Sequence, residues 1–264
     1  MLQDLMTQHT DKLARHIWQE ERQWQALLNL PAEQQIDVYL DLKSPHAYLA
    51  VRPTLELARD FAIELNFLPY TLSYTSLGVS TSVEADMQRR PPSAAADRKA
   101  RMYYTTAREY AALQNLPLRT PHRLLDSDLA HRVFLFAKQQ HREIAFAMWV
   151  YLAGWASGWR DFELEDKAAL QSACIAAEVD VANLDEFIAN DGEAEQALKE
   201  ISQRAETQGI VGVPHYVFTD PISQQPMGLF GREHLALIRH KLFDAGLARS
   251  DQVSASFSHT WPAK

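Results

Sequence analysis

The sequence predicts an α/β fold in which a strand–helix–strand unit and a strand–strand–helix unit flank a long helical block. An alternating, β-branched segment at 36–41 precedes helix signals at 45–60 and a second strand at about 62–68. A hairpin pattern occupies 215–230, and nearly all residues from about 82 to 205 have helical periodicity. These three observations predict an α/β chain in which a long helical block separates two strand-containing segments.

Each half of the sheet has its own local signals. The first two strands are joined by a helix within roughly 35 residues, so we expect them to be parallel. Turn residues at 220–226 separate the last two predicted strands, 215–219 and 227–230, and a final helix runs from Gly231 to about Phe243. The block between them contains five predicted helices, at 101–113, 128–139, 143–155, 167–178 and 184–204.

Length and composition limit the classes of function. A chain of 264 residues with 47% hydrophobic residues can bury a substantial core. The formal net charge of −8 argues against nucleic acid or an anionic membrane as the main partner. The single cysteine, Cys174, excludes an internal disulfide and fits a reducing compartment. It lies in an alanine-rich helical stretch, where we expect an ordinary buried residue.

The first residues and the distribution of apolar residues suggest a soluble, cytoplasmic protein. The first residues include an acidic side chain and lack the apolar region of a signal peptide. The longest nearly apolar run, 144–156, is shorter than the about 20 residues that span a bilayer. Residues 1–34 form a predicted helical extension that packs on the body or on a second subunit. Residues 248–264 are serine-rich and are predicted to be a flexible tail.

Three short phrases resemble a known family. They are Tyr39–Leu49, containing Ser44-Pro45-His46-Ala47; Gly212-Val213-Pro214 before an apolar strand; and Gly231 followed two residues later by Glu233. In this order they resemble 2-hydroxychromene-2-carboxylate isomerases and kappa-class glutathione transferases, of the DsbA-like thioredoxin superfamily. The resemblance implies a thioredoxin-like sheet formed by 35–81 and 206–247, with a helical insertion at 82–205.

The chain also departs from the patterns of these relatives. Ser44 and Ala47 occupy the positions of the two cysteines in dithiol oxidoreductases, so we expect no dithiol chemistry. His46 replaces the tyrosine of the isomerases, and Glu233 replaces their usual aspartate. The phrase is in this respect similar to the Cys-Pro-His-Cys of DsbA-type oxidoreductases without either sulfur.

Ser44 has two interpretations that use the same geometry. Serine followed by proline is a good helix N-cap. A helix N-terminus also favours negative charge and lowers the pKa of a thiol placed there. The resemblance implies that this thiol belongs to bound glutathione, with the Ser44 hydroxyl donating a hydrogen bond to it. His46 is either a polar residue at a helix start or a group that tunes the thiolate or acts as acid or base.

The other candidate residues would bind glutathione. Val213-Pro214 is either an ordinary turn or, as the resemblance implies, a cis-proline segment whose Val213 backbone pairs with the extended tripeptide. Glu233 is either a favourable charge in the first turn of a helix or the acceptor of the γ-glutamyl ammonium. Arg232 is a candidate for binding a glutathione carboxylate.

The sequence gives less indication of a functional role for the histidines and aromatic residues. The resemblance would place His46, His215 and His234 near one another, but their spacing does not suggest a metal site. Tryptophans and tyrosines of the insertion are predicted to be helical core: Trp149, Tyr151, Trp155 and Trp159. Other tyrosines could line a pocket for an aromatic substrate: Tyr70, Tyr74, Tyr103 and Tyr104.

Two functions from different classes remain open at this point. The first is a glutathione-dependent isomerase or transferase that uses the bound thiolate on a small aromatic or unsaturated substrate. The second is a redox-inactive, DsbA-like module that binds a peptide or protein without turnover. The resemblance further implies a homodimer.

Overall fold

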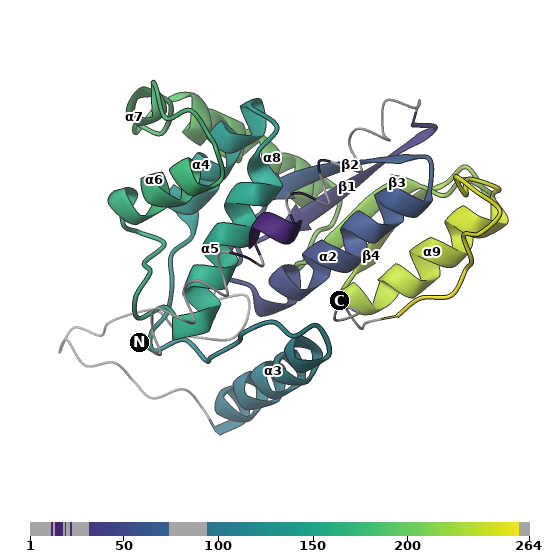
Figure 1. Cartoon of the computed structure of the whole chain (residues 1–264), viewed down its shortest axis with the longest axis horizontal. Helices are drawn as coiled ribbons and strands as arrows, with labels where there is room; N and C mark the ends of the chain where they lie inside the picture. The colour runs from purple at the N-terminus through teal and green to yellow at the C-terminus, as the bar shows by residue number, and fades with distance from the viewer. Residues whose placement is uncertain are drawn as a thin grey trace.

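The computed structural model describes residues 32–73 and 94–258, together with residues 12, 14–17, 19 and 22. Figure 1 shows a mixed sheet beside two groups of helices. The elements, in chain order, are β1 (Gln34–Leu40), α2 (Pro45–Asp60), β2 (Ile63–Pro69), α3 (Ala94–Leu113), α4 (Asp128–Gln139), α5 (Glu143–Ser157), α6 (Lys167–Ala176), α7 (Leu184–Phe187), α8 (Glu193–Thr207), β3 (His215–Thr219), β4 (Pro226–Phe230), the 3-10 turn η1 (Arg232–His234) and α9 (Leu235–Asp244).

The sheet has the strand order β2-β1-β3-β4. β1 and β2 are parallel, in register from Gln34 opposite Ile63 to Leu40 opposite Pro69. β3 is antiparallel to both β1 and β4. The parallel pair and the hairpin predicted from the sequence are therefore confirmed, and the sheet is of the thioredoxin type.

The helices form two groups around this sheet. α2 contacts β2, α9 and η1, whereas α4, α5, α6 and α8 contact one another in the insertion. α3 lies against α2, apart from α4 and α6 to α8 (Figure 1). Only Ala107 and Ala111 are buried among the α3 residues with described side chains. Within the described part of the chain, no helix is long and apolar enough to cross a bilayer.

The insertion has an aromatic core of its own. Trp155, Trp159 and Tyr151 are fully buried, as predicted, while Trp149 is half-buried. Cys174 is also fully buried, and this burial raises the pKa of its thiol to about 12, which makes it a poor nucleophile at neutral pH. The ring of Trp159 packs directly on Gly154, because a Cβ at Gly154 would lie 2.3–2.5 Å from its ring carbons.

Gly154→Ala is therefore expected to destabilise the protein by about 1–3 kcal/mol through overpacking, despite the higher helix propensity of alanine. Urea denaturation would measure this change. The control is Gly154→Ala made in a Trp159→Phe background, since phenylalanine lacks the ring atoms that the added Cβ would meet. Equal losses in both backgrounds would show that the clash with Trp159 is not the cause.

One predicted element is wrong, and another is longer than expected. Residues 184–204 do not form one helix: α7 ends at Phe187 and α8 begins at Glu193. Asp191 adopts a left-handed conformation with φ of 59°, and Gly192 then caps α8. This Asp-Gly turn interrupts the apolar periodicity that suggested one helix. α3 begins at Ala94 rather than at residue 101.

The predicted end segments are only partly covered by the described residues. Ala14 and Ile17, in helical positions of the extension, are buried, while most of residues 1–34 lies outside the described residues. In the predicted tail, the amide of Arg249 donates to the carbonyl of Asp60, and Arg239 donates to the carbonyl of Ser254. Residues 259–264 also lie outside the described part, as does Tyr74.

Candidate functional site

Ser44 is the N-cap of α2, at the carboxyl end of β1. Its Oγ accepts a hydrogen bond from the Ala47 amide at 3.2 Å, and Pro45 occupies the first helical turn. Its own amide donates to the carbonyl of Asp41 at 2.9 Å. Only 1% of Ser44 is exposed. The capping interpretation is thus correct, and the same geometry places a hydroxyl at the positive end of a helix dipole.

Tyr103 of α3 covers Ser44. The two hydroxyl oxygens lie 3.5 Å apart, and the Tyr103 ring meets the His46 ring edge-on with centroids separated by 4.3 Å. Burial raises the pKa of Tyr103 to about 12, so this hydroxyl is protonated at neutral pH. The sequence suggested Tyr103 only as a pocket wall, because no local pattern indicates that α3 returns to the start of α2.

His46 lies half-buried beside Ser44. Burial lowers its pKa to about 4, and the positive charge of Arg232 acts in the same direction. Glu233 and the Tyr103 backbone oppose this shift less strongly. His46 is therefore neutral at pH 7, and the positive charge beside it comes from Arg232 rather than from this imidazole.

The Val213–Pro214 peptide bond is cis. Continuing the antiparallel pairing one residue past Tyr39–His215 places Pro214 opposite Leu40, at the end of β1 where the chain turns into α2. The carbonyl of Pro214 accepts a hydrogen bond from the Gly231 amide. Val213 is only 3% exposed, and its N–H and C=O have no hydrogen-bond partner among the described residues.

Arg232 and Glu233 occupy η1, directly after β4. The guanidinium of Arg232 lies 3.3 Å from the ring centroid of Tyr110 on α3, and only 3% of Arg232 is exposed. Glu233 is exposed, and its carboxylate folds over Gly231, where a Cβ would lie 2.5 Å from either carboxylate oxygen. Gly231 has a φ of 110°, which suits glycine.

Most of the predicted site residues therefore lie near the start of α2, where tyrosines of α3 cover Ser44 and Arg232. His46, Arg232 and Glu233 lie within electrostatic range of one another, and His46 is two residues from Ser44 at the start of α2. His215 is buried, and the nearby His234 helps desolvation lower the pKa of its imidazole. No group of three or more metal-ligating side chains occurs within the described residues.

Directly behind Ser44 lies a buried charge cluster that the sequence interpretation missed. Asp41 is fully buried, 3.2 Å from both Lys43 Nζ and His131 Nε2, and it accepts the Leu72 amide at 2.7 Å. Burial by itself would raise the pKa of Asp41. The interactions with His131, Lys43 and Leu72 outweigh that effect and hold the pKa of this carboxyl below its usual range.

Further hydrogen bonds tie this cluster to the insertion. Lys43 Nζ donates to Ser127 Oγ at 3.1 Å, and the Tyr151 hydroxyl donates to the carbonyl of Asp41 at 3.0 Å. His131 Nδ1 lies 2.9 Å from Thr71 Oγ1. An acidic residue directly after a buried strand was the available sequence signal. Ser127 and His131 are distant in the sequence, and only the fold brings them to Asp41.

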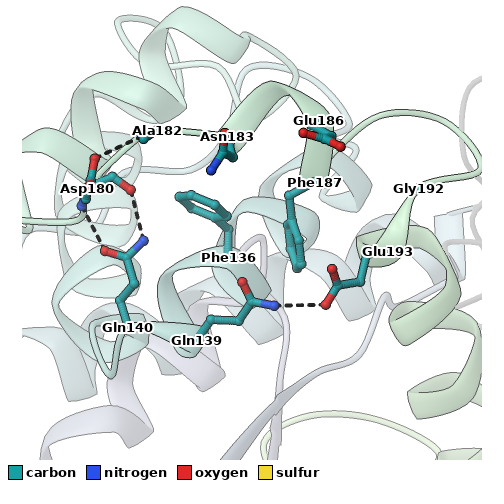
Figure 2. A pocket seen from close by; sticks show the side chains of 10 residues that line it. All are labelled: Phe136, Gln139, Gln140, Asp180, Ala182, Asn183, Glu186, Phe187, Gly192 and Glu193. Carbon is teal, nitrogen blue, oxygen red and sulfur yellow. Dashed lines mark hydrogen bonds between the residues drawn. The ribbon is translucent and has the colours of Figure 1, made fainter.

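A cavity of about 750 Å³ lies elsewhere, between α4, α7 and the start of α8. Figure 2 shows its aromatic side chains, Phe136 and Phe187, and its carboxylates, which include Glu186. Two of its glutamines are engaged, since Gln140 pairs with the backbone of Asp180 and Gln139 donates to Glu193. None of the predicted site residues lines this cavity.

Comparisons with known proteins agree with this architecture. The family model described as "DSBA-like thioredoxin domain" matches residues 35–243. Comparison with curated proteins returned no significant match. Among solved structures, a 2-hydroxychromene-2-carboxylate isomerase aligns with a TM-score of 0.61 at 18% identity, covering 80% of this chain and 95% of the other.

Two further solved structures align with this chain. A Streptomyces coelicolor structure described as a DsbA oxidoreductase aligns with a TM-score of 0.60 at 16% identity, covering 84% of this chain and 94% of the other. A Nitrosomonas europaea structure described as a protein disulfide isomerase aligns with a TM-score of 0.56 at 14% identity, covering 81% of this chain and 97% of the other. At these identities the likeness shows a shared fold and leaves the chemistry to be argued from the residues.

Proposed function

Because this chain belongs to the DSBA-like thioredoxin domain family, we propose that it is a glutathione-dependent isomerase similar to 2-hydroxychromene-2-carboxylate isomerase, or a related glutathione transferase. The observation that carries the proposal is the hydroxyl of Ser44 at the N-terminus of α2, where dithiol members of the superfamily have a cysteine. Neither Ser44 nor Ala47 can form a disulfide, so a reactive sulfur at this position has to come from a ligand.

The cis-proline segment fits the peptide part of glutathione. The N–H and C=O of Val213 are unpaired among the described residues although the residue is buried. Buried backbone groups are nearly always hydrogen-bonded in proteins, so these two groups are suited to an extended peptide added beside them. The exposed carboxylate of Glu233 is suited to the γ-glutamyl ammonium, and Arg232 to a carboxylate.

Bound glutathione supplies a thiolate that can add to and leave an activated double bond, so that an isomerase returns it unchanged and a transferase releases a conjugate. Ser44 donates a hydrogen bond to the sulfur, and the positive end of the α2 dipole favours its negative charge. His46 is neutral at pH 7 and adds no charge. We infer a small aromatic or unsaturated substrate, and a homodimer as the assembly.

Access to Ser44 requires the aromatic side chains of α3 to move. Tyr103 lies over Ser44, and Tyr110 lies over Arg232. Tyr103 is itself 38% exposed and α3 buries little of its surface, so a rotation of these side chains costs few buried contacts. We propose that the Tyr110 ring turns outward when the tripeptide binds, and that the Tyr103 ring shifts only enough to admit the sulfur between its hydroxyl and Ser44 Oγ.

Isothermal titration with glutathione tests this function, and Ser44→Ala tests the role of the hydroxyl. Because one charge-assisted hydrogen bond to the sulfur is lost, the pKa of the bound thiol is expected to rise by about one unit while affinity changes little. The thiolate absorbance of the complex as a function of pH measures this shift. An unchanged profile would remove Ser44 from the proposed site.

A second function is favoured by one specific observation, the covered state of Ser44 and Arg232 beneath α3. A redox-inactive module that binds a peptide or protein without turnover would not need these groups to be accessible. The absence of heat on titration with millimolar glutathione would favour this module. Both proposals predict no dithiol activity, and turnover in an insulin-reduction assay would contradict both.

A further inference from the structure

The hydroxyl of Ser44 has a limited hydrogen-bonding capacity, and part of it is already used. A serine hydroxyl has one proton to donate and two lone pairs that accept. One lone pair accepts the Ala47 amide at 3.2 Å. Within the described residues, the only other hydrogen-bond contact of this oxygen is with the Tyr103 hydroxyl at 3.5 Å. Ser44 therefore retains a proton that can be donated toward Tyr103 or toward a ligand.

The hydroxyl of Tyr103 also has unused hydrogen-bonding capacity. Among the described residues, its hydroxyl has Ser44 Oγ as its only hydrogen-bond partner. Ring packing orients this hydroxyl toward Ser44, since the His46 ring lies 4.3 Å and the Tyr104 ring 5.7 Å away, both edge-on. The pKa of Tyr103 is raised to about 12, so its proton is present for donation at neutral pH.

The spacing of the two hydroxyls leaves this pair weakly bonded. Hydroxyl–hydroxyl hydrogen bonds are usually about 2.7–2.8 Å long, and this one is 3.5 Å. An anionic atom that contacts both oxygens would accept two charge-assisted hydrogen bonds, each roughly twice as strong as a neutral one. Exchanging the weak mutual contact for two bonds to an anion is therefore favourable.

We infer that Tyr103 is a second catalytic hydroxyl, which donates together with Ser44 to the sulfur of bound glutathione. This inference rests on the proposed glutathione-dependent function and assigns a specific task to a residue of the helical insertion. Ionisation of the thiol releases its proton to solvent, and the two hydroxyls keep theirs. Such a pair favours a thiolate over a thiol or a thioether, because only the thiolate carries the charge that recruits both donors.

Tyr103→Phe is the direct test, because it removes the hydroxyl and keeps the ring that packs on His46. Tyr104→Phe is the matched control, since it removes a hydroxyl one residue along α3. The readout is the pH dependence of the cysteinyl β-carbon shift of labelled glutathione bound to each variant. We expect Tyr103→Phe to raise the pKa of the bound thiol by about one unit and Tyr104→Phe to leave it unchanged.

S-methylglutathione separates a role in charge stabilisation from a role in binding. Because its sulfur is uncharged, its affinity is expected to be the same for the wild type and Tyr103→Phe. If the wild type binds glutathione and Tyr103→Phe leaves the thiol pKa unaltered, the Tyr103 assignment fails and the proposed function survives. If the wild type binds no glutathione, the proposed function fails, and this inference fails with it.

Discussion

Asp41→Asn is expected to lower the free energy of unfolding by about 3–5 kcal/mol, the usual cost of removing one partner from a buried ion pair. The change leaves the charge of Lys43 buried, since this amine is 3.2 Å from the carboxylate and its side chain is only 5% exposed. It also weakens the hydrogen bond from the Leu72 amide. Urea denaturation at pH 7 measures the loss.

Two further variants make this result specific to the cluster. Asp97→Asn removes the acid of an exposed ion pair with Arg101 on α3, and we expect a change of at most about 0.5 kcal/mol. Asp41→Asn combined with Lys43→Met removes both charges and is expected to recover much of the stability. An Asp41→Asn loss no larger than that of Asp97→Asn would show that the cluster contributes little.

The cluster matters for function because it supports the residue that caps α2. The carbonyl of Asp41 accepts hydrogen bonds from both the Ser44 amide and the Tyr151 hydroxyl. Its side chain is tied to His131 of the insertion. The position of the Ser44 hydroxyl thus depends on contacts between the sheet and the insertion, so we expect the two to unfold together.

The second large effect is expected in the pH dependence of stability. The pKa of His46 is lowered from 6.5 to about 4 in the folded protein. Between these values the unfolded chain binds a proton at His46 and the folded chain does not, so stability rises with pH across this window and is unaffected by His46 above it. Lowering the pH from 6.5 to 4 should therefore cost about 2–3 kcal/mol through this residue.

His46→Gln is the corresponding test, because glutamine is polar but does not titrate. Thermal or urea unfolding measured from pH 7 to pH 4 should show a flatter stability profile for this variant. Parallel profiles for the wild type and His46→Gln would mean that His46 is readily protonated in the folded state.

Most of the fold could be predicted because its signals are local. The alternation in β1, the Ser44-Pro45 start of α2 and the turn between β3 and β4 each depend on a few adjacent residues. The break between α7 and α8 was missed because apolar periodicity continues on both sides of it, and the Asp191-Gly192 turn decides the outcome.

Only the site residues at the ends of sheet strands and of α2 could be predicted from the sequence. Ser44, Val213 and Glu233 stand in short phrases, and each lies next to a strand or helix end where such phrases are typical. Tyr103, Tyr110 and His131 come from the insertion, and only long-range packing brings them to this site. Burial, which lowers the pKa of His46 and raises that of Tyr103, is likewise a consequence of that packing.

A crystal structure of the protein soaked with glutathione would show whether a ligand sulfur occupies the start of α2. We expect the tripeptide beside Val213, its ammonium at Glu233, and its sulfur within hydrogen-bonding distance of both Ser44 Oγ and the Tyr103 hydroxyl. A soaked crystal in which the Ser44 and Tyr103 hydroxyls remain in direct contact with no sulfur between them, or in which glutathione occupies the cavity between α4 and α7 instead, would contradict this expectation.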